Sequence, residues 1–189
     1  SEDEAKALIK PVVKEIKNRF GDDVYTVKEE ETLEMAVVRL LQKYDLTVTT
    51  AESCTGGLLS GRIINVPGAS EVFKEGFVTY SNKAKRKTLD VSKSTLKKYG
   101  AVSAQTAKEM ATGGVFATDA DTCIAVTGLA GPEGEEEKPV GLVYIACYMK
   151  DKVKVEEYHF KGNREKIREQ SVVKALDLLR RSILANYKD

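Results

Sequence analysis

The residues best suited to do chemistry stand in one short segment, Ala51-Glu52-Ser53-Cys54-Thr55-Gly56-Gly57. A β-type run, 46–50, comes before it, and a helix-compatible run, 58–64, follows it. Small residues between a strand and a helix leave backbone N–H groups free at the helix N-terminus, where they can bind an anion. The same turn carries a hydroxyl and a thiol. The segment therefore predicts a nucleophile beside an anion or oxyanion site for a small molecule.

A serine nucleophile needs a neighbouring base, because its hydroxyl is weakly nucleophilic at neutral pH. His159 is the only histidine, and its place near the end of a strand-like run indicates a structural or surface residue. A lysine is the better base, and the run Tyr80-Ser81-Asn82-Lys83-Ala84-Lys85-Arg86-Lys87 offers several at a strand-to-helix junction. Such a lysine must be neutral, so burial or adjacent cations must lower its pKa from ~10.4. The alternative is a solvated basic helix face.

Two further segments have the composition of ligand-binding loops. Thr127-Gly128-Leu129-Ala130-Gly131-Pro132 follows a β-branched strand, and ligand sites in open α/β sheets gather at strand carboxyl ends. Gly162-Asn163-Arg164 opens the last helix, where N–H groups and a guanidinium together suit a phosphate. Ordinary connecting loops are the alternative for both. The charged run 133–138 is interpreted as a solvated loop or lid.

The elements that must position these residues alternate between strand and helix. Helices are expected over 7–20, 32–44, 58–65, 82–87, 103–116 and 163–187, and strands over 46–50, 76–80, 122–126, 142–148 and 153–160. This order predicts an α/β protein, a three-layer α/β/α sandwich with a mixed central β-sheet. Residues 1–31 read as a helix and a charged linker with too few apolar residues to fold alone, so the folded domain is expected over 32–189.

Composition narrows the classes of protein. Net charge is only +1 in 189 residues, which argues against the dominant basic surface of nucleic-acid binders. The three cysteines are odd in number and lack metal-ligand spacing, so we expect reduced thiols and no metal. No apolar run approaches ~18 residues and no signal-peptide pattern opens the chain, so we expect a cytoplasmic protein without membrane contact.

Four more short motifs accompany the segments 51–57 and 127–132. They are Val66-Pro67-Gly68-Ala69-Ser70, Val78-Thr79-Tyr80-Ser81-Asn82 with Lys85, Gly100-Ala101-Val102-Ser103 and Lys138-Pro139-Val140-Gly141. In this order the set resembles the CinA C-terminal domain, the family of the PncC nicotinamide mononucleotide deamidases. The resemblance covers about residues 32–187 and implies that family's fold. Residues 1–31 resemble the end of the middle region of long CinA proteins.

The resemblance implies a function in pyridine nucleotide recycling. The reaction would be metal-independent hydrolysis of the carboxamide of nicotinamide mononucleotide, giving nicotinic acid mononucleotide and ammonia, with no cofactor. Ser53 matches the family's nucleophile, and Lys85, three residues after the motif asparagine, matches its base. Tyr80 and Thr127 would position this pair and the carboxamide. The residues implied in substrate binding are Thr55, Gly56, Gly57, Ser70, Asn82, Gly128, Gly131 and Arg164.

Within that set, backbone N–H groups of 55–57 and of Gly128 would stabilise an oxyanion, and Arg164 with Ser70 would hold the phosphate or ribose. Two alternatives stay open. One is a nucleotide-binding regulatory module of a competence- or damage-inducible protein, and the other is Cys54 as the nucleophile. Apolar faces on the helices expected at 32–44 and 163–187 favour a homodimer, unless core packing uses them.

Overall fold

A computed structural model describes residues 1–134 and 137–187, which are built around one five-stranded sheet. The strands are β1 (Val48–Glu52), β2 (Phe73–Val78), β3 (Thr122–Gly128), β4 (Leu142–Met149) and β5 (Lys152–His159). Their spatial order is β2-β1-β3-β4-β5. Strands β2, β1 and β3 are parallel, whereas β4 and β5 run antiparallel to their neighbours. The predicted α/β fold with a mixed sheet is confirmed.

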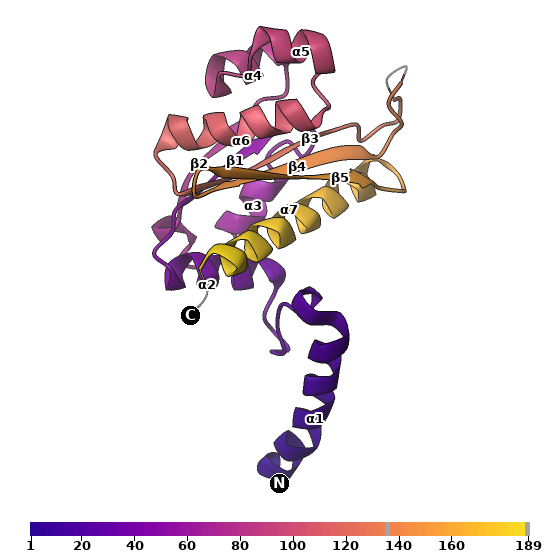
Figure 1. The fold of residues 1–189 in the computed structure, drawn as a ribbon. Helices are drawn as coiled ribbons and strands as arrows, with labels where there is room; N and C mark the ends of the chain where they lie inside the picture. The colour runs from indigo at the N-terminus through magenta and orange to yellow at the C-terminus, as the bar shows by residue number, and fades with distance from the viewer. Residues whose placement is uncertain (135–136, 188–189) are drawn as a thin grey trace.

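Helices cover both faces of the sheet (Figure 1). One face is covered by α6 (Ala104–Thr118), with α4 (Asn82–Leu89) and α5 (Lys93–Tyr99) lying outside it. The other face is covered by α2 (Leu33–Lys43), α3 (Leu58–Ile64) and α7 (Arg164–Asn186). Three layers result, as the alternation of strands and helices predicts.

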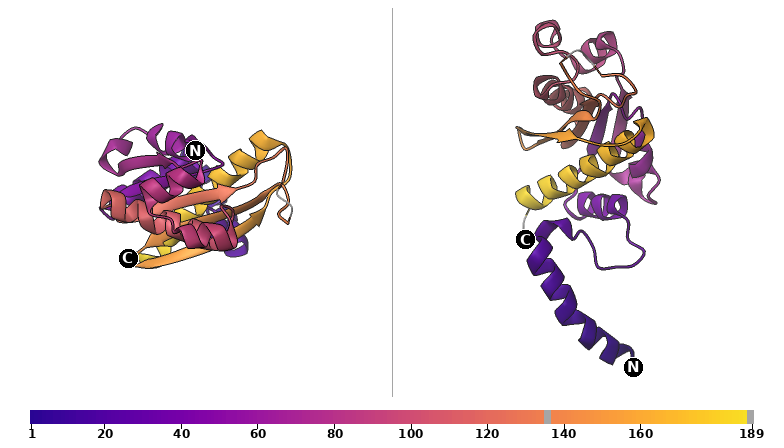
Figure 2. Two further views of the ribbon diagram at one scale, coloured as in Figure 1. Left: turned by 90° about the horizontal axis from the view of Figure 1, so that it is seen from above. Right: turned by 90° about the vertical axis from the view of Figure 1, so that its right-hand side faces the viewer.

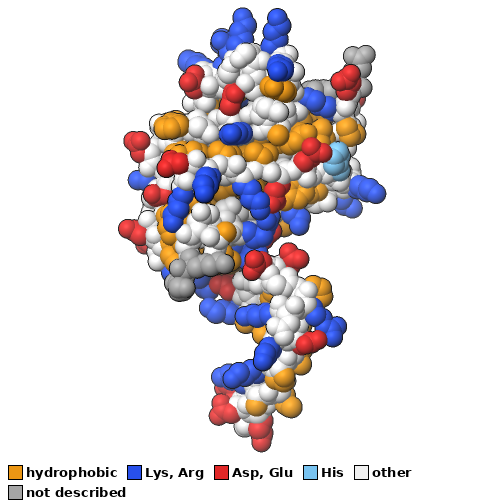
Figure 3. Space-filling model, in the orientation of Figure 1, with side chains coloured by type: hydrophobic (Ala, Val, Ile, Leu, Met, Phe, Trp, Pro, Cys, Tyr) orange, Lys and Arg blue, Asp and Glu red, His pale blue; other side chains and the backbone are white. Residues whose placement is uncertain are grey.

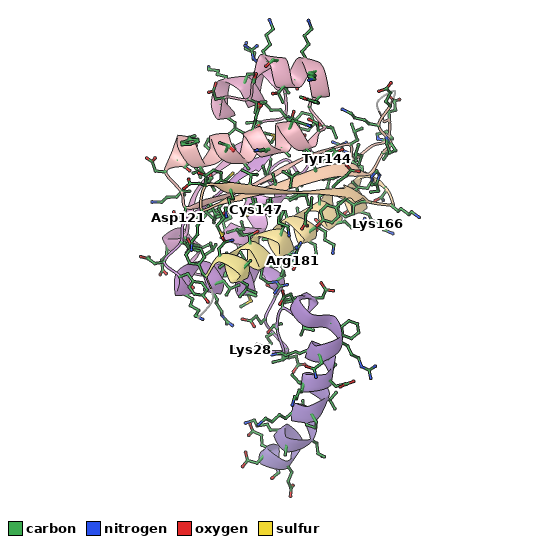
Figure 4. All side chains as sticks on the ribbon, in the orientation of Figure 1. Lys28, Asp121, Tyr144, Cys147, Lys166 and Arg181 are labelled. Carbon is green, nitrogen blue, oxygen red and sulfur yellow. The ribbon has the colours of Figure 1, made fainter. Side chains whose placement is uncertain are left out.

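An apolar core lies on each side of the sheet, because its central strands are buried on both faces and contribute side chains to both cores. On β4, Cys147 belongs to the core beneath α7, while Tyr144 packs against the core beneath α6 (Figure 4). The apolar faces of α2 and α7 also lie in the first of these cores. Those faces are therefore used in core packing, which removes the sequence argument for a homodimer and leaves the dimer a prediction.

Two differences from the expected elements matter for the site. Strand β1 begins and ends two residues later than the expected 46–50, so Glu52 is a buried strand residue. Helix α5 was not expected, because none of its seven residues is buried and it carries no apolar stripe. Its end signals are nevertheless present, with Ser92 as N-cap and Gly100 as C-cap.

The N-terminal helix α1 (Glu2–Phe20) projects away from the sandwich (Figures 1 and 2). None of its residues is buried, and it is followed by the 3₁₀ turn η1 (Gly21–Asp23). The Arg180 guanidinium of α7 donates a hydrogen bond to the Asp22 carbonyl. A domain boundary between residues 31 and 32 stays a prediction.

The loop expected after β3 is described only in part. Residues 135 and 136 of the charged run 133–138 lie outside the described residues. On the described side, the Lys138 ammonium donates to the Tyr99 carbonyl at 2.9 Å, which ties this loop to the end of α5.

Candidate active site

Three parallel strands end side by side, and the predicted nucleophile follows the middle one. Glu52 pairs with Val78 of β2 and with Val126 of β3. The Ser53 N–H donates to the Val126 carbonyl at 2.9 Å, and the Thr79 N–H donates to the Glu52 carbonyl at 2.8 Å. Ser53 is thereby fixed at the carboxyl edge of the sheet, where ligand sites of such sheets lie.

Lys85 reaches this serine from α4, which begins soon after β2 ends. Its Nζ lies 2.9 Å from Ser53 Oγ and donates to the Thr79 carbonyl at 2.8 Å, with the Tyr80 carbonyl at 3.5 Å. The Lys85 side chain is fully buried, whereas Lys83 on the same helix is exposed. Of the lysines in this run, it is therefore Lys85 that the structure places beside Ser53.

The environment of Lys85 favours its neutral form. Burial, one of the two causes expected from the sequence, lowers its pKa from 10.5 to about 8, whereas adjacent cations do not contribute. In the described part of the chain no carboxylate pairs with it. A neutral amine has two N–H donors and one lone pair. In its charged form Lys85 donates to Ser53 Oγ. When it is neutral, the carbonyls of 79 and 80 can accept its two N–H groups, and the lone pair can then accept the Ser53 hydroxyl proton.

Cys54, the alternative nucleophile, lies in a different environment. Its side chain is buried, and burial raises its pKa from 9.0 to about 11. The thiolate is the nucleophilic form of cysteine, so this raised pKa disfavours the reactive form of Cys54 at neutral pH. Cys54, Cys123 and Cys147 are all free and buried, as expected for reduced thiols.

The N-terminus of α3 already holds an anion of the protein itself. The fully buried Glu52 carboxylate accepts the N–H groups of Gly57 (3.0 Å), Leu59 (3.1 Å) and Ser60 (2.8 Å), and the Ser60 hydroxyl at 2.6 Å. The anion site predicted at this helix start is thus filled by Glu52. Sequence reasoning missed this role because it placed residue 52 after the strand.

Few N–H groups of the turn remain for a substrate. The Gly56 N–H donates to the Ser53 carbonyl at 3.1 Å, and the Gly57 N–H is held by Glu52. The Cys54 and Thr55 N–H groups have no acceptor within 1–134 and 137–187. Gly128 offers a further donor. The Leu129 N–H points to Leu142 of β4, so by strand alternation the preceding N–H, that of Gly128, points towards β1.

Three more of the predicted residues meet near this edge. The Arg164 guanidinium donates to the Gly131 carbonyl at 2.6 Å and to the Tyr80 hydroxyl at 3.2 Å. Arg164 is the first residue of α7 and Asn163 is the N-cap, which places a cation at a helix N-terminus. The Thr127 hydroxyl instead donates to the Ala101 carbonyl at 2.8 Å, so this buried side chain holds the 100–103 segment.

Two predicted residues are placed differently. Ser70 lies in the 3₁₀ turn η2 (Ala69–Glu71), before β2, whereas Ser53 follows the parallel strand β1. It is exposed and lies at the end of the sheet opposite to Ser53, so within this chain the structure does not bring the two together. Asn82 is the exposed first residue of α4, and Ser81 caps that helix by accepting from the Ala84 N–H.

The family model described as "CinA C-terminal domain" matches residues 30–183 of this sequence. The chain belongs to the CinA family.

Similar proteins agree with this assignment. The chain is 51% identical over 183 residues to a Clostridium novyi protein described as competence-damage inducible, and 49% identical over 181 residues to a "CinA-like protein" of Kosmotoga olearia. These alignments cover 96% and 95% of this chain but 44% of each relative, so the chain spans about half the length of the curated relatives it matches.

Solved structures of CinA proteins share the fold. A competence/damage inducible protein from Agrobacterium tumefaciens matches with a TM-score of 0.76 and 43% identity, over 78% of this chain and 91% of that one. A CinA superfamily protein from Escherichia coli matches with a TM-score of 0.75 and 39% identity, over 82% of this chain and 93% of that one. The sandwich is thus the CinA fold.

None of the described helices is long and apolar enough to cross a bilayer.

Besides the role of Glu52, that of a second residue of this CinA domain was not foreseen from the sequence. The Arg168 guanidinium donates from Nε to the Cys54 carbonyl at 3.0 Å and from Nη2 to the Thr55 carbonyl at 2.8 Å. Its only signal was its position four residues after Arg164, which puts both arginines on one face of α7. Which loop that face meets depends on how α7 packs on the sheet.

The basic side chains of the lysine-rich run divide between the site and the surface. Lys85 points inward, and the other cations of α4 and α5 stand out over the outer helices (Figure 3). They are Lys83, Arg86, Lys87, Lys93, Lys97 and Lys98. The two sequence interpretations, a catalytic lysine and a solvated basic face, thus describe different residues of one segment.

Proposed function

We propose that this CinA domain hydrolyses the carboxamide of nicotinamide mononucleotide, with Ser53 as nucleophile and Lys85 as general base. One observation carries the proposal. A fully buried lysine, whose pKa is lowered to about 8, lies 2.9 Å from a serine hydroxyl at the carboxyl edge of the sheet. A buried amine beside a hydroxyl is the arrangement that activates serine when no histidine is at hand.

In the first half of the reaction, neutral Lys85 takes the Ser53 proton as Oγ attacks the carboxamide carbon. The N–H groups of Thr55 and Gly128, beside that of Cys54, are donors available to the oxyanion of the tetrahedral intermediate. Losing one such donor typically costs ~10²–10³ in rate. The Lys85 ammonium then protonates the departing nitrogen, which leaves as ammonia, and a nicotinoyl ester remains on Ser53.

In the second half, neutral Lys85 takes a proton from water as the water oxygen attacks the ester carbonyl. Collapse of this second intermediate breaks the ester bond, and Lys85 returns the proton to Ser53 Oγ. The product is the free carboxylic acid. Because Lys85 alternates as base and acid in both halves, a pKa near neutrality suits both of its roles.

The phosphate of the mononucleotide is assigned to the start of α7. Arg164 supplies a guanidinium there, and its bonds to Tyr80 and Gly131 hold it at the same edge as Ser53. A phosphate would replace these neutral acceptors with a charge-assisted pair. Tyr80, whose ring is exposed, would then be free to contact the nicotinamide or ribose.

Proton NMR of nicotinamide mononucleotide incubated with the purified chain tests the proposal, with Ser53→Ala as control and a chelator present. We expect conversion to nicotinic acid mononucleotide by the native chain and none by the variant. A regulatory module would instead bind the mononucleotide in calorimetry with its NMR spectrum unchanged, and that result would overturn the proposal.

A further inference from the structure

The nucleophile turn is held from two sides by opposite charges. On one side the Glu52 carboxylate accepts the N–H groups of Gly57, Leu59 and Ser60. On the other side the Arg168 guanidinium donates to the carbonyls of Cys54 and Thr55. Glu52 thus fixes the end of the turn that enters α3, whereas the peptide groups next to Ser53 depend on Arg168.

The turn needs such external restraint because of its glycines. Gly56 and Gly57 have φ values of +60° and +95°, which lie in the left-handed region. Glycine moves between conformations at little cost, so these residues do not themselves fix the orientation of the preceding peptide groups. A guanidinium offers donors in a rigid planar fork, and here two of them reach two successive carbonyls.

Peptide planarity transmits this restraint to the active-site side of the turn. In a trans peptide the C=O and the following N–H point in opposite directions. Since the Cys54 carbonyl is turned towards Arg168, the Thr55 N–H of the same peptide plane points away from α7. That N–H and the Cys54 N–H are the donors of the turn left without an acceptor within 1–134 and 137–187.

We propose that Arg168 is a positioning residue that aims the Thr55 N–H at the oxyanion of the tetrahedral intermediate. The proposal deepens the proposed amide hydrolysis and rests on it. Arg168 does not touch the reacting atoms in this scheme. It acts through the Cys54-Thr55 peptide, so its loss should weaken stabilisation of the transition state more than binding of the substrate.

A purely structural role for Arg168 would be to link α7 to α3, and Arg62 provides the matched control. Arg62 lies on α3, pairs with Glu34 of α2 at 3.0 Å, and reaches Glu169 of α7 at 3.4 Å. It therefore links α7 to α3, the helix that follows the turn held by Arg168, without contacting the carbonyls of that turn. Arg62→Gln removes an inter-helix tie and leaves the Cys54-Thr55 peptide restrained.

The test compares Arg168→Gln, Arg168→Lys and Arg62→Gln with the native chain by kcat, KM and melting temperature. We expect Arg168→Gln to lower kcat by ~10²-fold or more while KM changes only a few-fold. Arg168→Lys keeps a cation that can reach one carbonyl, so it should recover part of the lost kcat. Arg62→Gln should keep the native kcat, even if its melting temperature falls as much as that of Arg168→Gln.

A fluorophosphonate that labels activated serines provides the second readout, because its phosphoryl oxygen occupies the oxyanion position whatever the natural substrate is. We expect Arg168→Gln to slow labelling of Ser53 strongly and Arg62→Gln to leave it near the native rate. Equal labelling by both variants, or a loss of activity confined to KM, would overturn the positioning role. If the native chain labels but leaves nicotinamide mononucleotide intact, the proposed function fails while the labelling rates still decide the role of Arg168.

Discussion

Lys85 Nζ lies 2.9 Å from Ser53 Oγ, although the two residues are 32 positions apart in the chain. The fold makes this contact in two steps. Parallel pairing of β1 with β2 brings the residue after each strand to the same edge, and α4 then turns Lys85 back over that edge. The contact is therefore a property of the sheet, and it is fixed before any ligand arrives.

The pH dependence of catalysis follows from Lys85. Because the base must be neutral and its pKa is lowered to about 8, kcat/KM should rise with pH and level off above that value. Initial rates measured in buffers of constant ionic strength from pH 6 to 9.5 would report this limb. A rate that is flat across that range would mean that Lys85 is not the titrating base.

The burial of the Lys85 amine should also make the free energy of unfolding depend on pH. Between pH 10.5 and about 8 the unfolded Lys85 takes up a proton that the folded one does not, so the free energy of unfolding falls as pH falls through this window. Lys85→Met removes that contribution and should be more stable than the native chain below pH 8, though inactive. Denaturant unfolding of both proteins at pH 7.5 and 10 gives the change in the free energy of unfolding between the two pH values. The other titrating groups contribute equally to this change in both proteins, so their contribution cancels when the two are compared.

Glu52 should matter for stability more than any surface carboxylate. Glu52→Gln keeps its size but replaces one acceptor oxygen by an amide NH2 group, which faces N–H donors and leaves buried groups without partners. Bonds to a charged group contribute roughly 1.5–3 kcal/mol each, so we expect a loss of about 2–4 kcal/mol. Glu71→Gln is the control, since exposed Glu71 accepts one bond from Gln42. Equal effects of the two changes would show that the Glu52 network is not stabilising.

Much of this site was predictable from local sequence, and the remainder depends on tertiary structure. The turn after β1 identified Ser53, because the strand, the small residues and the helix are adjacent in the chain. The residues alone left several lysines open, and the family resemblance favoured Lys85. Arg168 and Glu52 were missed, because one is supplied by a helix over 100 residues away and the other by a two-residue shift of β1. Ser70 lies before β2 and away from Ser53, which its motif could not reveal because a motif does not show at which end of the sheet it lies.

Arg164 should distinguish substrates with and without a phosphate. We expect Arg164→Ala to raise KM for nicotinamide mononucleotide by about tenfold or more, the loss of one charge-assisted pair, with a smaller effect on kcat. The measurement is the ratio of kcat/KM for the mononucleotide and for nicotinamide riboside, which lacks the phosphate. The native chain should prefer the mononucleotide and the variant should lose most of that preference. An unchanged ratio would place the phosphate elsewhere.

The central claim is that Ser53, activated by Lys85, is the nucleophile that releases ammonia. The most direct measurement is the rate of ammonia production from nicotinamide mononucleotide by the native chain, Ser53→Ala and Cys54→Ala, each checked for native melting behaviour. We predict release by the native chain and by Cys54→Ala, and a loss of ~10³-fold or more in Ser53→Ala. Release that survives in Ser53→Ala, or that disappears only in Cys54→Ala, would contradict this account.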